Sequence, residues 1–117
     1  MEDDFTKFLP LLPAQVYVLL ALAGGDMRGS CIMREIARQS EGAYLLGQGA
    51  VYGNLKRLMD QGMVQDVANV DPRQRIYLLS SRGRKLLEAE VLRMEELVWE
   101  ARLRLGESSR HESFTSY

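Results

Sequence analysis

Apolar residues recur at helical spacing in two segments near the start of the chain. The first, Pro13 to Ala23, is apolar almost all round, and proline is tolerated in a first helical turn, so we expect a short central helix. Gly24, Gly25 and Asp26 interrupt the pattern. The second segment, Ser30 to Gln39, predicts an amphipathic helix whose inward residues are Ile32, Met33, Ile36 and Ala37.

A third helical period lies in Leu45 to Val64, the most informative segment of the chain. Its apolar side is spaced i, i+4, i+7, i+8 and consists of Val51, Leu55, Leu58 and Met59. Gly47 suits a permissive N-cap, and Gly62 occupies the position where a left-handed residue ends a helix. The opposite side carries groups suited to phosphates and base edges, namely Gln48, Tyr52, Asn54, Lys56 and Arg57.

After Gly62 the apolar period changes from helical to strand-like. Met63 to Ala68 and Arg75 to Leu79 are short β-branched and aromatic runs, separated by a polar, proline-containing stretch. These runs predict a hairpin whose tip includes Arg73. Three helices followed by a hairpin predict a mainly α fold with a small β-hairpin, a winged helix-turn-helix over residues 13–80. In such a fold one helix enters the DNA major groove while the hairpin reaches along the backbone.

The final helix is expected over Ser81 to Leu105. A stripe spaced alternately four and three residues apart predicts a seam that packs along another helix; it consists of Leu87, Val91, Met94, Val98, Ala101 and Leu105. Further apolar residues beside the stripe are Leu86, Leu92, Leu97 and Trp99. A two-fold dimer is the simplest way to bury this surface, with Pro13 to Ala23 contributing from the partner. The alternative is a helix that folds back on its own domain.

These motifs resemble the PadR family of bacterial transcriptional regulators over roughly residues 13 to 105. The features that carry the resemblance are Gly29, the GxVY pattern at Gly49–Tyr52, LKRL at Leu55–Leu58, Gly62 before an apolar strand, and RIYLLSSRG at Arg75–Gly83. The resemblance implies a winged-helix dimer, in most members a repressor, with a C-terminal helical dimerisation region. A single long helix after the wing is similar to the short subfamily, some of whose members bind planar hydrophobic compounds at the dimer centre.

The chain departs from the family pattern at three positions. Ser30 stands where the family usually has tyrosine, Ala50 where it has threonine and Gly53 where it often has proline. Ala50 removes a hydroxyl that would bond a phosphate. Gly53 costs about 1 kcal/mol of helix propensity relative to alanine, so either the helix is locally loose or a backbone approaches closely there. These changes permit a second function, a winged-helix module that contacts proteins and no longer reads DNA.

Charge is unevenly distributed along the chain. The whole sequence has 15 basic and 16 acidic residues, for a formal net charge of −1. Between Arg28 and Lys85, however, ten basic residues stand against five acidic ones, and the acidic excess lies at residues 2–4 and in the part of the last helix after Lys85. A segment of net charge +5 is the electrostatic footprint expected of a nucleic-acid binder. The alternative is that these arginines only solubilise the surface.

If the partner is duplex DNA, the basic and amide side chains divide into two roles. We expect phosphate contacts from Tyr52, Lys56, Arg73 and Arg75. Gln48 and Asn54 are the candidates for base edges, because side-chain amides pair bidentately with adenine, and Arg57 suits either role. Two recognition helices related by a two-fold axis would read half-sites about one duplex turn apart, so the operator should be roughly palindromic.

Trp99, the only tryptophan, and Met94 share the helix expected to form the dimer. We favour a role for both in the interface core. The alternative is a small hydrophobic ligand between the two copies, since aromatic rings stack on planar molecules and methionine adapts to varied shapes. Occupation of such a site would alter the spacing of the two reading heads and hence DNA affinity.

The rest of the composition argues against other classes. The only histidine is His111, no cysteine and histidine cluster has metal-ligand spacing, and no glycine loop resembles a nucleotide cradle. We therefore expect no enzyme, metal or cofactor. Cys31, the single cysteine, suits a core or boundary position better than a redox switch. Without a signal peptide or transmembrane run, the protein is expected in the cytoplasm, with an N-terminal arm at 1–12 and a disordered tail at 106–117.

Overall fold

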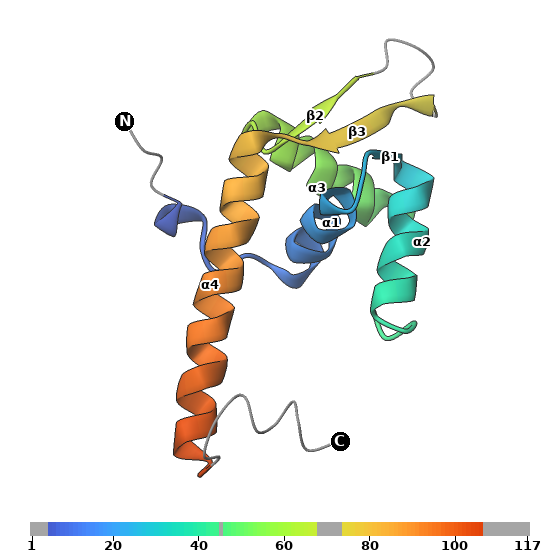
Figure 1. The fold of residues 1–117 in the computed structure, drawn as a ribbon. Helices are drawn as coiled ribbons and strands as arrows, with labels where there is room; N and C mark the ends of the chain where they lie inside the picture. Colours follow the sequence, from blue (N-terminus) through green and yellow to red (C-terminus); the bar gives the residue numbers. More distant parts are fainter. Residues whose placement is uncertain (1–4, 45, 68–73, 107–117) are drawn as a thin grey trace.

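The computed structural model describes residues 5–44, 46–67 and 74–106, and arranges them as a small helical domain with one long helix along its side (Figure 1). Its elements are, in chain order, η1 (Thr6–Phe8, a 3-10 helix), α1 (Pro13–Ala23), β1 (Met27–Arg28), α2 (Gly29–Gln39), α3 (Gln48–Asp60), β2 (Val64–Asp66), β3 (Ile76–Leu79) and α4 (Ser81–Arg104). This order confirms the expected fold class, a winged helix-turn-helix followed by a long helix.

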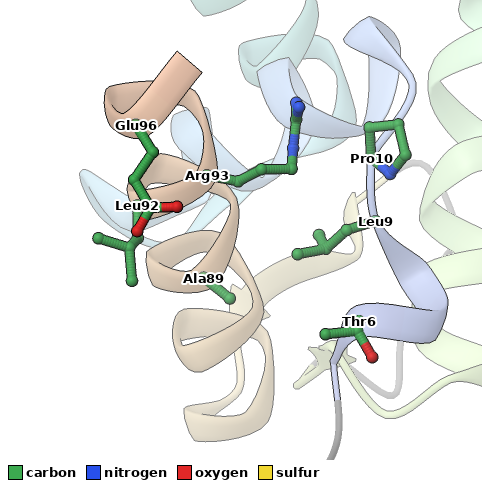
Figure 2. Close-up of a pocket in the computed structure, with 7 residues that line it drawn as sticks. All are labelled: Thr6, Leu9, Pro10, Ala89, Leu92, Arg93 and Glu96. Carbon is green, nitrogen blue, oxygen red and sulfur yellow. The ribbon is translucent and has the colours of Figure 1, made fainter. Parts of the chain in front are cut away.

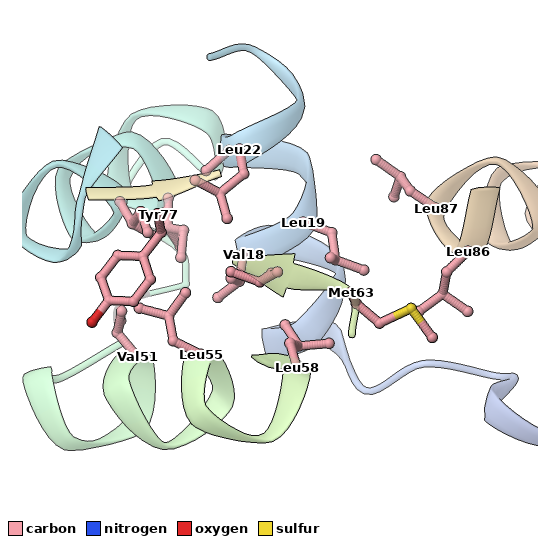
Figure 3. Packing of buried hydrophobic residues seen from close by; sticks show 14 of the residues in the cluster. Val18, Leu19, Leu22, Val51, Leu55, Leu58, Met63, Tyr77, Leu86 and Leu87 are labelled. Atoms are coloured by element: carbon pink, nitrogen blue, oxygen red, sulfur yellow. The ribbon is translucent and has the colours of Figure 1, made fainter. Parts of the chain in front are cut away.

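Helix α1 lies at the centre of the domain, as its apolar sequence predicts. It contacts α2, α3, α4 and β3. Val18 and Leu19 are fully buried, and Leu22 nearly so. Figure 3 shows these side chains packed against residues of α3, β3 and α4, labelled Val51, Leu55, Leu58, Tyr77, Leu86 and Leu87. One hydrophobic core therefore joins α1, α3 and β3 to the first turns of α4.

Helix α3 begins and ends at the glycines that the sequence indicates. Gly47 is its N-cap, with an extended backbone, and Gly62 has φ of +78° directly after the C-cap Gln61. The left-handed conformation at Gly62 turns the chain into β2, which glycine allows without a Cβ penalty. Val51 and Leu55 are fully buried, so α3 is anchored by the face predicted for it.

The sheet has three antiparallel strands in the order β1-β3-β2. Val64 pairs with Leu79 and Asp66 with Tyr77 across the expected hairpin, whose strands are shorter than predicted. Met27 pairs with Tyr77 on the other side of β3. The two residues of β1 were not predicted, because a strand of this length has no recognisable period. The hairpin tip at residues 68–73 lies outside the described residues.

Helix α4 starts at a side-chain cap and then leaves the core. Ser80 Oγ accepts a hydrogen bond from Gly83 N at 2.9 Å. The side chains buried on α4 end at Glu90, and beyond it the helix extends away from the other helices (Figure 1). The long helix is thus half core element and half exposed extension. None of the described helices combines the length and the apolarity needed to span a membrane.

Candidate nucleic-acid interface

The outward face of α3 carries small residues beside two cations. Because Val51, Leu55 and Leu58 point into the core, the opposite side of the helix is turned to solvent. Its exposed residues are Gly49, Ala50, Gly53, Lys56, Arg57 and Asp60. The space around Gly49 and Gly53 is open, with no atom within 4 Å of a Cβ built there. This surface leaves room for a duplex close to the helix, and close approach of a backbone is one of the two explanations that the sequence left for Gly53.

Gln48, Lys56 and Arg57 have the exposure that the predicted DNA contacts need. Gln48 is the first residue of α3, where backbone N–H groups and the helix dipole favour anions. Lys56 Nζ lies 3.4 Å from Asp60 Oδ2, and both side chains are about 70% exposed. Surface pairs of this kind contribute little to stability, so a phosphate can replace the aspartate at small cost.

Tyr52 does not lie on the solvent face with these residues, contrary to the sequence interpretation. Its side chain is half-buried, and its ring lies 6.5 Å from that of Tyr77 on β3. A Cβ at Gly29, the first residue of α2, would stand 2.6 Å from Cζ of Tyr52. Tyr52 therefore fills the space between α2, α3 and β3, and Gly29 is needed to admit its ring.

The side chain of Asn54 forms a hydrogen bond within its own helix. Its Nδ2 donates to the carbonyl of Ala50 at 2.8 Å, one turn earlier. The side chain is partly exposed, at the edge of the outward face. This bond uses one of the two Nδ2 hydrogens and leaves Oδ1 and the other hydrogen for a base edge. Gln48 is the more exposed of the two amides.

The hairpin presents one of its two predicted arginines. Arg75 Nε lies 3.2 Å from Oδ2 of Asp66, which joins the two strands of the hairpin just below its tip. About a third of the Arg75 side chain is exposed. Burial, the largest effect, raises the pKa of the neighbouring Tyr77 phenol, so it stays neutral at physiological pH. Arg73 lies outside the described residues, and its contact with phosphate stays a prediction.

Two further groups on α2 alter the surface next to α3. Arg38 forms a hydrogen-bonded ion pair with Glu35 at 2.6 Å, and this bond lowers the pKa of the glutamate. Arg34 donates to Cys31 Sγ at 3.3 Å, which is the main reason that the pKa of this thiol is lowered. Cys31 is partly exposed, in agreement with the expected boundary position. Of the two arginines of α2, Arg38 is thus paired with an acidic side chain, whereas Arg34 bonds to a thiol.

The predicted dimer seam divides into a buried start and an exposed remainder. Leu87 is only 8% exposed and belongs to the core of its own domain, as does the fully buried Leu86. Leu86 has no surface left for a partner and Leu87 has little, contrary to the sequence interpretation. Met94 is partly exposed, and the exposed residues of the seam are Val91, Val98, Ala101 and Leu105. Further exposed apolar side chains on α4 are Leu92, Leu97, Trp99 and Leu103.

An open groove of about 440 Å³ separates α4 from the N-terminal arm, here residues 5–12 (Figure 2). Its walls are largely apolar and come from Thr6, Leu9, Pro10, Ala89, Leu92, Arg93 and Glu96. Neither Met94 nor Trp99 lines this groove, so it is distinct from the ligand position considered from the sequence. Among the described residues, no cluster of three histidine, cysteine or acidic side chains is arranged to hold a metal ion.

Comparison with known proteins identifies relatives of this arrangement. A family model described as the transcriptional regulator PadR-like family matches residues 18–89. An uncharacterised 37.1 kDa protein in transposon TN4556 of Streptomyces fradiae is 39% identical over 84 residues. The match covers 72% of this chain and 24% of that protein, so the chain spans about a quarter of the length of this curated relative.

Solved structures share the fold. Bacillus subtilis PadR in complex with operator DNA is 19% identical, with a TM-score of 0.57, covering 66% of this chain and 45% of that chain. Bordetella bronchiseptica BpsR, whose DNA binding is regulated by 6-hydroxynicotinic acid, is 23% identical, with a TM-score of 0.65, covering 94% of this chain and 79% of that chain. At these identities the likeness establishes the architecture.

Proposed function

The chain belongs to the PadR-like family of transcriptional regulators, and from this we propose that it is a dimeric, sequence-specific DNA-binding repressor acting in the cytoplasm. The observation that carries the proposal is the outward face of α3, where small residues allow close approach and Lys56 and Arg57 are exposed. In a winged helix-turn-helix this is the helix that enters the major groove. The PadR structure solved with operator DNA supports the same use of the fold.

We assign the contacts by their accessibility. Lys56 and Arg57 hold phosphates from the outward face of α3, and Arg75 holds the backbone from the hairpin, together with Arg73 at its tip. Gln48 is the first candidate for a base edge because its amide is exposed at the start of α3. Asn54 is the second candidate because it is less exposed than Gln48 and one of its Nδ2 hydrogens bonds to Ala50, while Tyr52 contributes mainly by positioning α3.

Two substitutions on α3 test this assignment. Lys56→Ala should weaken binding to every duplex alike and reduce the salt dependence of log K by about one charge. Gln48→Ala should reduce discrimination at one position by about 1 to 3 kcal/mol. Arg104→Ala, which removes one charge from the far end of α4, is the matched control and should change neither quantity. Equal effects of both α3 substitutions on specific and random duplexes would contradict the assignment.

The competing function is a winged-helix module that contacts proteins. Ser30, Ala50 and Gly53 favour it, since they remove groups typical of the family pattern. Retention on duplex DNA that falls steeply between low and moderate salt distinguishes the two, because side chains that neutralise phosphates release the counterions condensed on the duplex. Absence of duplex retention at low ionic strength would favour the protein-contact module.

A small hydrophobic effector is the second element of the proposal. The regulation of BpsR by 6-hydroxynicotinic acid supports it, as does the surface exposure of Trp99, which is 39%. Met94 and Trp99 serve first as interface residues, and an aromatic compound would bind beside them. Tryptophan fluorescence titrated with a panel of aromatic compounds tests this, and a flat response throughout would count against an effector at that position.

A further inference from the structure

The C-terminal end of α3 and the N-terminal end of α4 are joined by short contacts that bypass the hairpin tip. Ser80 N donates to the carbonyl of Met63 at 3.1 Å, and Ser80 Oγ donates to that of Gly62 at 2.6 Å. A Cβ at Gly83 would overlap the carbonyl oxygen of Met63, so α4 approaches this turn as closely as a glycine allows. The start of α4 is therefore joined directly to the turn that follows α3.

Arg82 extends this junction to a third element, the N-terminal arm. Its Nε donates to the carbonyl of Gln61, the C-cap of α3, at 3.1 Å. A cation in this position satisfies a terminal carbonyl and interacts favourably with the helix dipole. The same guanidinium lies 5.7 Å from the ring centroid of Phe5 and 5.9 Å from that of Phe8, within the range of cation–π attraction. One side chain thus contacts the recognition helix and the arm at once.

The arm is anchored to α4 a second time, further along the helix. Leu11 N donates to Oε2 of Glu90 at 3.0 Å, and this buried carboxylate is also paired with Arg93. Beside this second anchor, the arm and α4 form the walls of the groove in Figure 2, which on α4 runs from Ala89 to Glu96. A displacement of the arm away from α4 would therefore disturb the ring contacts of Arg82, and through Arg82 the hydrogen bond to the end of α3.

We propose that Arg82 is a positioning residue for DNA reading, which holds the end of α3 in register with α4 and the N-terminal arm. The inference rests on the function proposed above, and assigns Arg82 no contact with DNA. The arm then affects DNA sequence specificity, because Phe5 and Phe8 hold the Arg82 guanidinium, which donates a hydrogen bond to the carbonyl of Gln61. Movement of the arm or of α4 then changes the orientation in which α3 enters the major groove of the DNA.

Arg82→Ala tests the proposal, with Arg84→Ala as the matched control, since Arg84 is exposed two residues further along α4. The probes are a duplex enriched from a randomised pool by the wild-type protein and a random duplex of equal length. Loss of one charge-assisted hydrogen bond should lower the specific affinity of Arg82→Ala about tenfold. Affinity for the random duplex and its salt dependence should not change, and Arg84→Ala should keep the wild-type ratio of specific to random binding.

Hydrogen exchange without DNA separates this inference from the proposed function. Arg82→Ala should exchange backbone amides faster in residues 5–11 and 61–64, whereas Arg84→Ala should match the wild type. If the wild-type protein binds no duplex, the proposed function fails and the inference fails with it, whatever the exchange shows. If the wild type discriminates and Arg82→Ala retains its specific-to-random ratio, the positioning role alone is wrong.

Substitution of the arm keeps the test informative if Arg82→Ala does not fold. Phe5→Leu and Phe8→Leu leave Arg82 and its bond to Gln61 in place, and each removes one ring contact of the guanidinium. Phe8→Leu also removes the contact of the Phe8 ring with Lys7. The double substitution should lower the ratio of specific to random affinity severalfold at unchanged salt dependence. Its effect should be non-additive with Arg82→Lys in a double-mutant cycle, whereas full additivity would show that the arm and Arg82 act independently.

Discussion

Gly53 lies on the exposed face of α3, where no atom stands within 4 Å of the position a Cβ would take. The sequence left two explanations for this glycine, a loose helix or the close approach of a backbone. Apart from the backbone of its own helix, no described atom of the chain lies within 4 Å of that position. If a backbone approaches Gly53 closely, it therefore belongs to a binding partner. Gly53→Ala should raise the free energy of unfolding of the isolated protein by about 1 kcal/mol in chemical denaturation.

Gly53→Ala should also weaken duplex binding, because the added methyl group projects from the face of α3 that enters the major groove of the DNA. Stabilisation together with weaker binding is the expected combination. Unchanged or tighter binding to the enriched duplex would show that the DNA does not come close to the middle of α3.

Glu90 is a buried carboxylate with three hydrogen bonds, to Leu11 N and the Arg93 guanidinium. The bond from Arg93 is the largest effect and holds the pKa of Glu90 below its ordinary value of 4.5, although burial opposes it. A lowered pKa in the folded state means that the pairing stabilises the fold above pH 4.5. This stabilisation is lost as the pH falls through the lowered value.

Glu90→Gln should therefore reduce the free energy of unfolding by about 1 to 3 kcal/mol at pH 7, the range for a hydrogen bond to a charged group. The difference between wild type and variant should shrink below about pH 4, as denaturant titrations at several pH values would measure. Glu88→Gln, an exposed neighbour on α4, is the control with little expected effect. A constant difference down to pH 2 would contradict an ionised Glu90.

Individual contact roles were the least predictable part of the site. The helical period correctly placed Val51 and Leu55 inward, and left Lys56 and Arg57 outward. Tyr52 was misplaced because its position flanks the buried stripe, and only the glycine at the start of α2 makes room for its ring. Local hydrogen bonding of the Asn54 amide also depends on rotamer choice, which periodicity does not determine.

At the scale of elements, the junction between α3 and α4 is a contact that glycine makes possible. Gly83→Ala should lower the free energy of unfolding by about 3 kcal/mol or more, because a methyl group would overlap the backbone of Met63 and force the helices apart. Gly53→Ala, the same change at an open position, is the control and should stabilise. A neutral Gly83→Ala would show that α4 shifts without loss of core packing.

Helix α1 and the end points of α3 followed from the sequence because local rules determine them. Apolar periodicity set the faces, and Gly62, in the left-handed conformation, set the end of α3. Strand β1 depends on pairing with β3, distant in sequence, and the 3-10 helix in the arm is a single turn. Neither leaves a periodic signal, and the link from Glu90 to Leu11 spans 79 residues.

At the scale of the whole molecule, the exposed half of α4 is the surface that a partner copy would cover. The residues predicted for the seam are exposed or partly exposed from Val91 onward, whereas Leu87 belongs to the core of its own domain. Periodicity alone does not reveal where a long helix leaves its domain, because the same stripe continues across the boundary. The interface that we propose therefore begins at Val91 and runs to Leu105.

Val98→Glu should dissociate the dimer, because it places a charge in the middle of the proposed seam. Leu103→Glu makes a similar change on the same helix away from the seam, and the two side chains are 46% and 50% exposed. Sedimentation velocity at micromolar concentration should give a monomer for Val98→Glu and a dimer for the control. Dimers in both, or monomeric wild-type protein, would contradict the proposed interface.

Selection of bound duplexes from a randomised pool measures sequence reading and two-fold assembly of this protein in one experiment. We expect enrichment of a roughly palindromic sequence whose half-sites are about 10 base pairs apart, the separation of two recognition helices on one face of the duplex. Binding of that sequence should fall steeply with salt. Failure to enrich any sequence, or a single half-site bound by one chain, would contradict the account.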